Sequence, residues 1–212
     1  MKFPTAQWEA MKGYDQYCPI AHSLGLVGER WTLLVVRELL YGPNRYTDLA
    51  ERLPGIGTRI LADRLKELEA AGLITKRRLP PPAASTVYEL TEEGRLLRPV
   101  LHELARFGAR LLGPPPSDAL VPGWLLHAVD IALSPVSPVG TIAFHVGDEE
   151  ASLVEGVVKA GIANNYDVLV EADPTAFYHL IVEGKHDGVR IEGDRELLDR
   201  LIRAFAPEPV PA

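Results

Sequence analysis

Three consecutive prolines, Pro114 to Pro116, constrain the fold of this 212-residue chain more than any other feature. Proline has no backbone N–H and its ring clashes with the preceding helical turn, so no helix continues through such a run. We therefore expect residues 113–119 to be a stiff linker. The chain should form one domain at residues 1–112 and another at residues 120–206, followed by a short tail at residues 207–212.

The two halves of the chain also differ in the sign of their charge. Residues 1–112 contain 16 Lys and Arg against 13 Asp and Glu, a balance of +3, whereas residues 113–212 contain 6 against 16, a balance of −10. Phosphate groups would attract the first half and repel the second. The net charge of −7 therefore does not exclude nucleic acid as a partner of the first domain.

Composition and the N-terminus restrict the class of protein. Apolar residues make up 47% and charged residues 24%, as in soluble globular proteins, which excludes a disordered chain or a collagen-like repeat. No window approaches the roughly 18 uninterrupted apolar residues of a membrane helix, and the first residues lack the apolar core of a signal peptide. We expect a cytoplasmic protein without membrane contact. The single cysteine, Cys18, cannot form an internal disulfide or a multi-cysteine zinc site.

The first half has the element order of a winged helix-turn-helix domain. The expected elements are helices at residues 31–39, 46–53 and 58–71, strands at residues 73–78 and 86–90 around a proline loop, and a long helix at residues 91–112. Helical spacing places Trp31, Leu34, Val35 and Leu39 on the buried face of the first helix, and Gly72 caps the third. In such a domain the second helix of the pair enters the major groove. The alternative is a small helical domain with a solvated charged face.

The residues expected to face DNA are basic or polar. Thr58 and Arg59 lie at the N-terminal end of the third helix, where base contacts concentrate, and arginine can bind guanine with two hydrogen bonds. The basic residues of the hairpin suit phosphate or minor-groove contact. The candidate DNA-binding residues are Arg45, Tyr46, Thr47, Thr58, Arg59, Lys66, Lys76, Arg77 and Arg78.

Six short segments of the first half match a known family. They are CPI at residues 18–20, GERWTLL at 28–34, GPNRYTDL at 42–49, PGI at 54–56, LKELEAAGLI at 65–74 and YELT at 88–91. Their order and spacing resemble those of the HxlR-type winged-helix transcriptional regulators. The resemblance implies a DNA-binding homodimer, with the N-terminal segment and the helix at 91–112 forming the two-fold interface. Because a two-fold protein presents two equivalent recognition helices, we expect a pseudo-palindromic DNA operator, on which the protein acts as a repressor. Pro99 would then mark a local kink in that helix.

Two features of the chain bear on this resemblance. Glu29 and Arg30 stand where the family usually has Gly-Lys, and Gly57 stands where it commonly has serine. The first change keeps the positive charge, and the second removes a candidate helix cap or phosphate contact, which can alter base preference. Cys18 stands where some HxlR-type regulators carry a redox-sensing cysteine, and the alternative is a small buried apolar side chain.

The second half alternates strands with helices, which makes the whole chain an α+β protein. We expect strands at residues 141–146, 166–172 and 189–192 and helices at residues 173–181 and 195–205. Two segments, DVLVEADP at 167–174 and VRIEGDRELL at 189–198, resemble sterol-carrier-protein-type lipid-binding domains. This resemblance covers about residues 120–205 and implies an apolar tunnel for a hydrophobic or amphipathic small molecule. The candidate lining residues, each of which fits a core position equally well, are Trp124, Leu125, Phe144, Phe177, Tyr178 and Leu180.

No enzyme, metal or cofactor site is expected. His179, Glu183 and His186 lie close in sequence but match no standard zinc spacing, and the sequence has no nucleophile elbow, Walker motif or dinucleotide glycine motif. Two functions fit the chain. One is a ligand-responsive DNA-binding regulator, and the other is a lipid carrier whose winged helix serves for dimerisation or protein contact. The carrier leaves Arg59 and the basic hairpin without a role, so we favour the regulator.

Overall fold

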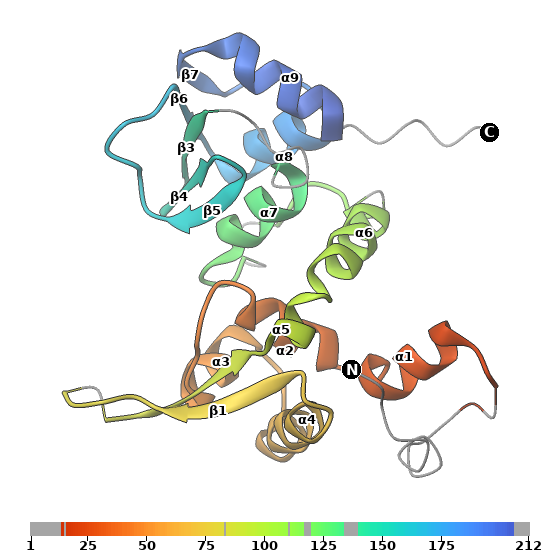
Figure 1. Ribbon diagram of the computed structural model, residues 1–212. Coiled ribbons are helices and arrows are strands. Elements are labelled where there is room, and N and C mark those ends of the chain that lie inside the picture. Colours follow the sequence, from red (N-terminus) through yellow and green to blue (C-terminus); the bar gives the residue numbers. More distant parts are fainter. Residues whose placement is uncertain are drawn as a thin grey trace. The chain divides into compact units, whose positions relative to one another are not determined.

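The computed structural model describes residues 14, 16–82, 84–109, 111–116, 120–133 and 140–205 (Figure 1). Its contacts form two compact units, Met1–Arg98 and Pro99–Ala212. The boundary lies one residue inside helix α6 (Arg98–Ala109), whereas the sequence predicts it at residues 113–119, of which 117–119 lie outside the described residues. Almost all of α6 therefore belongs to the second unit.

The first unit contains the predicted helices and strands. Its elements are α1 (Pro19–Val27), α2 (Thr32–Leu39), α3 (Tyr46–Arg52), α4 (Thr58–Ala70), β1 (Ile74–Arg78), β2 (Thr86–Leu90) and α5 (Glu92–Arg95). Each predicted helix from α2 to α4 and each predicted strand is present within one residue of its expected ends, whereas α1 was not predicted. The expected buried face of α2 is wrong at two positions. Trp31 precedes the helix with a φ of 79°, and Leu34 is 38% exposed, while Val36 is fully buried.

Helices α3 and α4 form the helix-turn-helix. Leu61, Leu65 and Leu68 are almost fully buried and fix one face of α4 to the unit. The helix ends at Ala70, and Gly72, two residues later, has a φ of 71° that glycine adopts without strain. The Gly72 N–H donates to the main-chain carbonyl of Glu69, and the Leu73 N–H donates to that of Leu68, both at 3.0 Å. These bonds turn the chain directly from α4 into β1.

The wing is an antiparallel hairpin with a short third segment. Strands β1 and β2 pair from Ile74 opposite Leu90 to Arg78 opposite Thr86. Asn44 forms a bridge to this hairpin, donating its N–H to the Tyr88 carbonyl at 3.0 Å and accepting from the Tyr88 N–H at 2.8 Å. The segment between α2 and α3 is thereby fixed to the wing.

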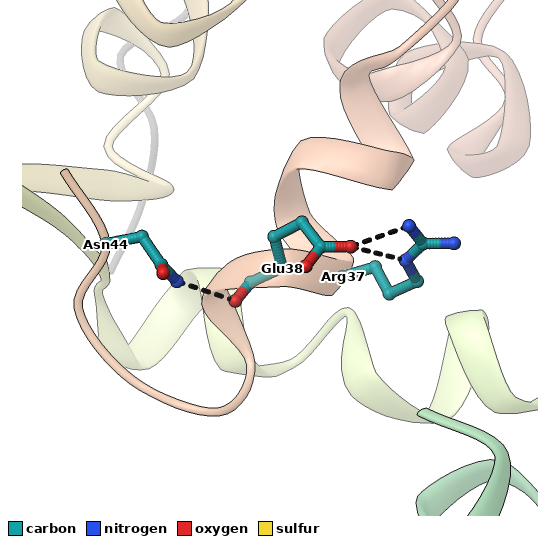
Figure 2. A network of polar contacts seen from close by, with 3 residues as sticks. All are labelled: Arg37, Glu38 and Asn44. Atoms are coloured by element: carbon teal, nitrogen blue, oxygen red, sulfur yellow. Dashed lines mark hydrogen bonds and ion pairs between the residues drawn. The ribbon is translucent and has the colours of Figure 1, made fainter. Parts of the chain in front are cut away.

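A polar network joins this bridge to the end of α2 (Figure 2). The side-chain amide of Asn44 donates to the Glu38 carbonyl at 2.9 Å, and the Glu38 carboxylate accepts from Arg37 Nε at 2.9 Å and Nη2 at 2.6 Å. The Glu38 side chain is only 1% exposed. Burial raises the pKa of the Glu38 carboxyl, and the neighbouring Arg37 offsets part of this rise.

The carbonyl of Leu73 marks the junction of α4, the wing and α5. It accepts from the Thr91 N–H at 3.0 Å, and the Thr91 hydroxyl lies 2.7 Å from the Gly72 carbonyl and 3.1 Å from that of Leu73. The same hydroxyl accepts from the Gly94 N–H at 3.1 Å and caps α5. Gly94 packs so closely here that a Cβ would lie 2.0 Å from the Leu73 oxygen.

The single long helix predicted at residues 91–112 is wrong. Helices α5 and α6 are separate, and α6 ends at Ala109. The N–H of Leu97 bonds to the carbonyl of Gly94, three residues earlier, as in a 3₁₀ turn. Pro99 has no N–H with which to restore the helical pattern. Pro99 thus accompanies a break in the helix and not a kink.

Besides most of α6, the described residues of the second unit form a mixed sheet and three further helices. These elements are α7 (Trp124–Leu133), β3 (Thr141–Val146), β4 (Glu149–Val154), β5 (Val157–Ala160), β6 (Val168–Ala172), α8 (Pro174–Glu183), β7 (Arg190–Gly193) and α9 (Arg195–Phe205). The strand order is β5-β4-β3-β6-β7, with β3 and β6 parallel and the other pairs antiparallel. The predicted elements are confirmed within two residues, but α7, β4 and β5 were not predicted.

One face of this sheet packs on its helices. Helix α7 lies against β4 and β5, and α8 and α9 lie against β6 (Figure 1). Ile142, Phe144, Leu153 and Val170 face this core from the strands. The Glu149 carboxylate accepts from the N–H groups of Gly123 and Leu125 at the start of α7. Within the described part of the chain, no helix is both long and apolar enough to cross a bilayer.

Replacing Gly94 should destabilise the protein. A Cβ at this position overlaps a backbone oxygen that cannot move without disturbing the junction, so we expect Gly94→Ala to lower the free energy of unfolding by about 1–3 kcal/mol. Gly108 in α6 is the control, because a Cβ there meets no atom within 4 Å. Gly108→Ala should raise stability by about 0.5–1 kcal/mol. Urea unfolding of both variants measures the difference, and equal effects would contradict the crowding argument.

Glu38 should make stability fall as the pH rises. Its folded pKa lies above the ordinary 4.5, so between these two values the native state keeps a proton that the unfolded chain has lost. Stability is lost across that window, with a limiting slope of about 1.4 kcal/mol per pH unit. Glu38→Gln removes this titration and leaves the main-chain carbonyl that Asn44 binds. The stability of the variant relative to the natural protein should therefore rise with pH in urea unfolding from pH 4 to 8.

Glu89→Gln is the contrasting control for this titration. The pKa of Glu89 is lowered, chiefly by its hydrogen bonds from Arg77, so its charge stabilises the fold above pH 4.5 and this stabilisation is lost as the pH falls. Below pH 4.5, the stability of Glu89→Gln relative to the natural protein should therefore rise as the pH falls, in urea unfolding extended below that pH. If the relative stabilities of the two variants changed with pH in the same direction, the opposite pKa shifts of Glu38 and Glu89 would be contradicted.

Candidate nucleic-acid interface

Helix α4 presents a polar face on the side away from its buried leucines. Thr58, Arg59 and Lys66 are all exposed, as predicted from helical spacing. The Arg59 side chain is 94% exposed, and its Nε lies 3.9 Å from Asp63 in a loose ion pair. A guanidinium held this weakly can exchange its carboxylate for a base or a phosphate at little cost.

The N-terminus of α4 is positioned by α3. The Tyr46 hydroxyl donates to the Thr58 carbonyl at 2.7 Å, which links the first residues of the two helices. The Arg45 N–H donates to the Asp48 carboxylate at 3.0 Å and so caps α3. Gly57 precedes α4 and provides no side-chain cap. Of the predicted residues in this region, Tyr46 thus has a structural bond that the sequence did not indicate, while Arg45 and Thr47 keep exposed side chains.

The three basic residues of the wing do not have equal surroundings. All three are exposed, with Lys76 and Arg78 on one face of β1 and Arg77 on the other. Arg77 donates from Nε and Nη2 to both carboxylate oxygens of Glu89, at 3.0 and 3.1 Å. These bonds raise the pKa of Arg77. The charge of Arg77 is therefore locally balanced, whereas Lys76 lies 5.7 Å from the centre of the Tyr88 ring.

An exposed apolar strip lies along α6. Val100, Leu104 and Phe107 are 51%, 50% and 64% exposed, and their spacing of four and three residues places them on one side of the helix. We call these three residues the α6 stripe. They were not named from the sequence, although their spacing in a helix with Leu101 on another side was a usable signal. In α1, Ile20 is also exposed, at 71%.

The other predicted site residues are less informative. Cys18 is a free, half-buried cysteine that directly precedes α1. Leu125, Phe144, Phe177 and Leu180 belong to the buried core of the second unit. The remaining two candidate pocket residues are Trp124, which packs against that core, and Tyr178, whose hydroxyl donates to the Leu112 carbonyl.

The residues His179, Glu183 and His186, which lie close in sequence, make separate pairwise contacts in the second unit. His179 Nδ1 lies 3.1 Å from Glu183, and Lys185 lies 2.7 Å from the same carboxylate. His186 pairs instead with Asp199 at 3.3 Å. Among the described residues, no group of three or more His, Cys, Asp or Glu side chains is arranged to hold a metal ion.

Comparison with known proteins assigns the first half of the chain to a family. The HxlR-like helix-turn-helix family matches residues 26–115. The chain is 31% identical over 101 residues to the uncharacterized HTH-type transcriptional regulator YvaP of Bacillus subtilis, covering 47% of this chain and 94% of YvaP. It is 35% identical over 98 residues to the HTH-type transcriptional regulator YodB of the same organism, covering 46% of this chain and 88% of YodB.

A solved structure of the reduced form of YodB from B. subtilis shares 33% sequence identity with the chain. The alignment of the two covers 48% of this chain and 100% of the YodB chain, with a TM-score of 0.41. The family match at residues 26–115 contains α2 to α6, and with them the exposed face of α4 and the wing. The chain therefore belongs to the HxlR-like helix-turn-helix family of transcriptional regulators.

Proposed function

We propose that the protein is a homodimeric, sequence-specific repressor that inserts α4 into the major groove of a pseudo-palindromic operator. The observation that carries this proposal is the exposed N-terminal turn of α4. Thr58 and Arg59 project from the helix end that base-reading residues occupy in helix-turn-helix proteins, and the Arg59 guanidinium is almost fully exposed. A two-fold protein presents two such helices, so the half-site centres should lie about 10 base pairs apart, or a multiple of that.

Each basic residue has a distinct part in this proposal. Arg59 reads a guanine through two hydrogen bonds, and Thr58 contacts a phosphate or a thymine methyl. Lys66, Lys76 and Arg78 neutralise phosphates without regard to sequence. Arg77 contributes less to this, because two of its nitrogens already donate to Glu89 and its charge is partly neutralised by that carboxylate.

The α6 stripe supports the homodimer. Three large apolar side chains on one side of a helix, each at least half exposed, are costly in water and are typical of a surface that a partner covers. A second copy of the chain supplies the same stripe, as a two-fold interface requires.

The second unit enters the proposal as an effector unit of the sterol-carrier type. Its acidic balance disfavours contact with phosphate, and an apolar core between one sheet face and three helices suits a neutral or weakly polar ligand. In the structure this core is filled by its own side chains, among them Phe144 and Phe177. Binding would thus require the core to open. Native mass spectrometry of the purified protein tests for a bound lipid.

Redox sensing by Cys18, in the first unit, stays a prediction.

Arg59→Ala should weaken operator binding by about 1–3 kcal/mol and relax the base preference at one position, because it removes a direct base contact. The exposed Arg200 of α9 serves as the control, and Arg200→Ala should bind like the natural protein. Mobility shifts on operator and scrambled DNA, over a range of salt concentrations, measure both the binding affinity and the base preference. In vitro transcription from an operator-bearing promoter, expected to fall when the protein binds, tests the repressor role. Equal loss on operator and scrambled DNA would contradict base reading by Arg59.

Leu104→Glu should dissociate the dimer. It places a charge in the centre of the α6 stripe, and an unpaired buried charge costs about 3–5 kcal/mol, so the dimer dissociation constant should rise by at least about 100-fold. Glu103→Gln, at the neighbouring exposed position, should leave the dimer intact. Sedimentation over a range of protein concentrations separates the two results. A dimer that survives Leu104→Glu unchanged would place the interface elsewhere.

A further inference from the structure

Helix α6 has an inward face as well as the α6 stripe. Leu101 and His102 are 9% and 8% exposed, and both belong to the second unit. Side chains two positions apart on a helix point about 160° away from each other, so His102 lies nearly opposite Leu104. The same helix therefore presents one face to its own unit and the other to the surface proposed for the second copy.

A buried polar pair holds the inward face. His102 Nε2 lies 2.9 Å from Asp130 Oδ2 of α7, and the two side chains are 9% and 0% exposed. A carboxylate only accepts hydrogen bonds, so Nε2 of His102 carries the proton of this bond. Apolar residues of similar volume would stabilise such a contact equally well or better. A directional hydrogen bond instead fixes an orientation, because it sets the rotation of α6 about its own axis and the position of α6 along α7.

A second contact follows the end of α6. The Tyr178 hydroxyl of α8 donates to the Leu112 carbonyl at 2.8 Å. This bond ties the segment after α6 to the second unit before the three prolines begin. The second unit thus binds this part of the chain at His102 and again at Leu112.

The first residue of α6 is bound within the first unit. Arg98 Nη2 donates to the Leu40 carbonyl at the end of α2, at 3.2 Å, and the Arg98 guanidinium lies 5.9 Å from the centre of the Tyr41 ring. Helix α5 precedes it and is fixed by Thr91 and Gly94 at the base of the wing. The start of α6 therefore belongs to the DNA-binding unit, so a rotation of α6 would also move Arg98 and its contacts in that unit.

We propose that the His102–Asp130 pair is the positioning contact through which the second unit sets the geometry of the DNA-binding dimer. This inference rests on the homodimeric regulator proposed above. Helix α7 carries Asp130 toward α6, while Leu125, Val129 and Leu133 of the same helix lie in the core of the second unit. Any change in that core which moves α7 is passed directly to α6 and its stripe. The proline segment after residue 112 is not needed for this coupling.

Asp130→Asn tests the proposal, because it removes the carboxylate charge at nearly constant volume. The full chain carries Cys18→Ser and Glu69→Cys, and a spin label at the exposed position 69 reports the separation of the two α4 helices in the dimer. We expect a folded dimer in which the label distance is shifted or broadened. We also expect the operator Kd of the unlabelled protein to change by about 5-fold or more, the lower end of typical coupling between sites.

Glu171→Gln is the matched control. It removes a carboxylate from another His–Asp/Glu pair of the same unit, in which His145 Nδ1 and Glu171 Oε1 are 4.0 Å apart and both side chains are partly exposed. The label distance and the operator Kd should stay unchanged. If Asp130→Asn does not fold, the joint replacement His102→Leu with Asp130→Leu takes its place, since it removes both polar partners together.

The outcomes separate this inference from the proposed function. A folded Asp130→Asn dimer with the natural label distance and operator Kd would overturn the positioning role and leave the regulator intact. Failure of both variants to fold would make the pair a requirement for folding and would also overturn it. A natural protein that neither dimerises nor binds operator DNA would remove the proposed function itself, and the inference with it.

Discussion

The Leu73 carbonyl is the constraint on which the DNA-binding unit depends. It receives the Thr91 N–H, lies against Gly94 and follows immediately after the turn that ends α4. The end of α4, the start of the wing and the start of α5 thus meet at one peptide group. This arrangement explains why short elements form a well-defined unit. A helix of four residues such as α5 is marginal in isolation, and here its start is fixed by Thr91, which caps the helix and contacts the Gly72 and Leu73 carbonyls.

The positive charge that this unit can offer to a partner depends on ion pairing as much as on composition. Arg59 and Arg77 are both arginines on exposed elements, yet Arg77 has a bidentate carboxylate partner and Arg59 has only a loose ion pair with Asp63. Arg59 can therefore meet DNA without losing a strong bond, whereas the charge of Arg77 is already partly neutralised by Glu89. A count of positive residues would treat them as equal. In the function proposed above, this contrast favours α4 for sequence reading and makes Arg77 a weaker contributor than Lys76 and Arg78 within the wing.

The sequence predicted elements well where local signals agreed with tertiary structure. Glycine at position 72 and the leucine spacing of α4 define both ends of that helix, and the alternating pattern of β3 defines a strand with correct ends. Helix α7 is apolar on nearly all sides and has no helical periodicity to detect, while β4 begins with Glu149 and Glu150 and does not read as a strand. Of the site, the exposed face of α4 was predictable. The Arg77–Glu89 and His102–Asp130 pairs were not, because each joins residues far apart in sequence.

The position of the unit boundary has a consequence for how this protein can change by recombination. The three prolines look like a natural joint, yet His102 and Leu112 make their contacts with residues beyond them. A gene fusion or truncation at the proline run would separate α6 from α7 and expose a buried histidine and Leu101 to water. A cut at this point would leave His102 and the Leu112 carbonyl without the hydrogen-bond partners that they have in the whole chain, although the first half alone matches 94% of YvaP.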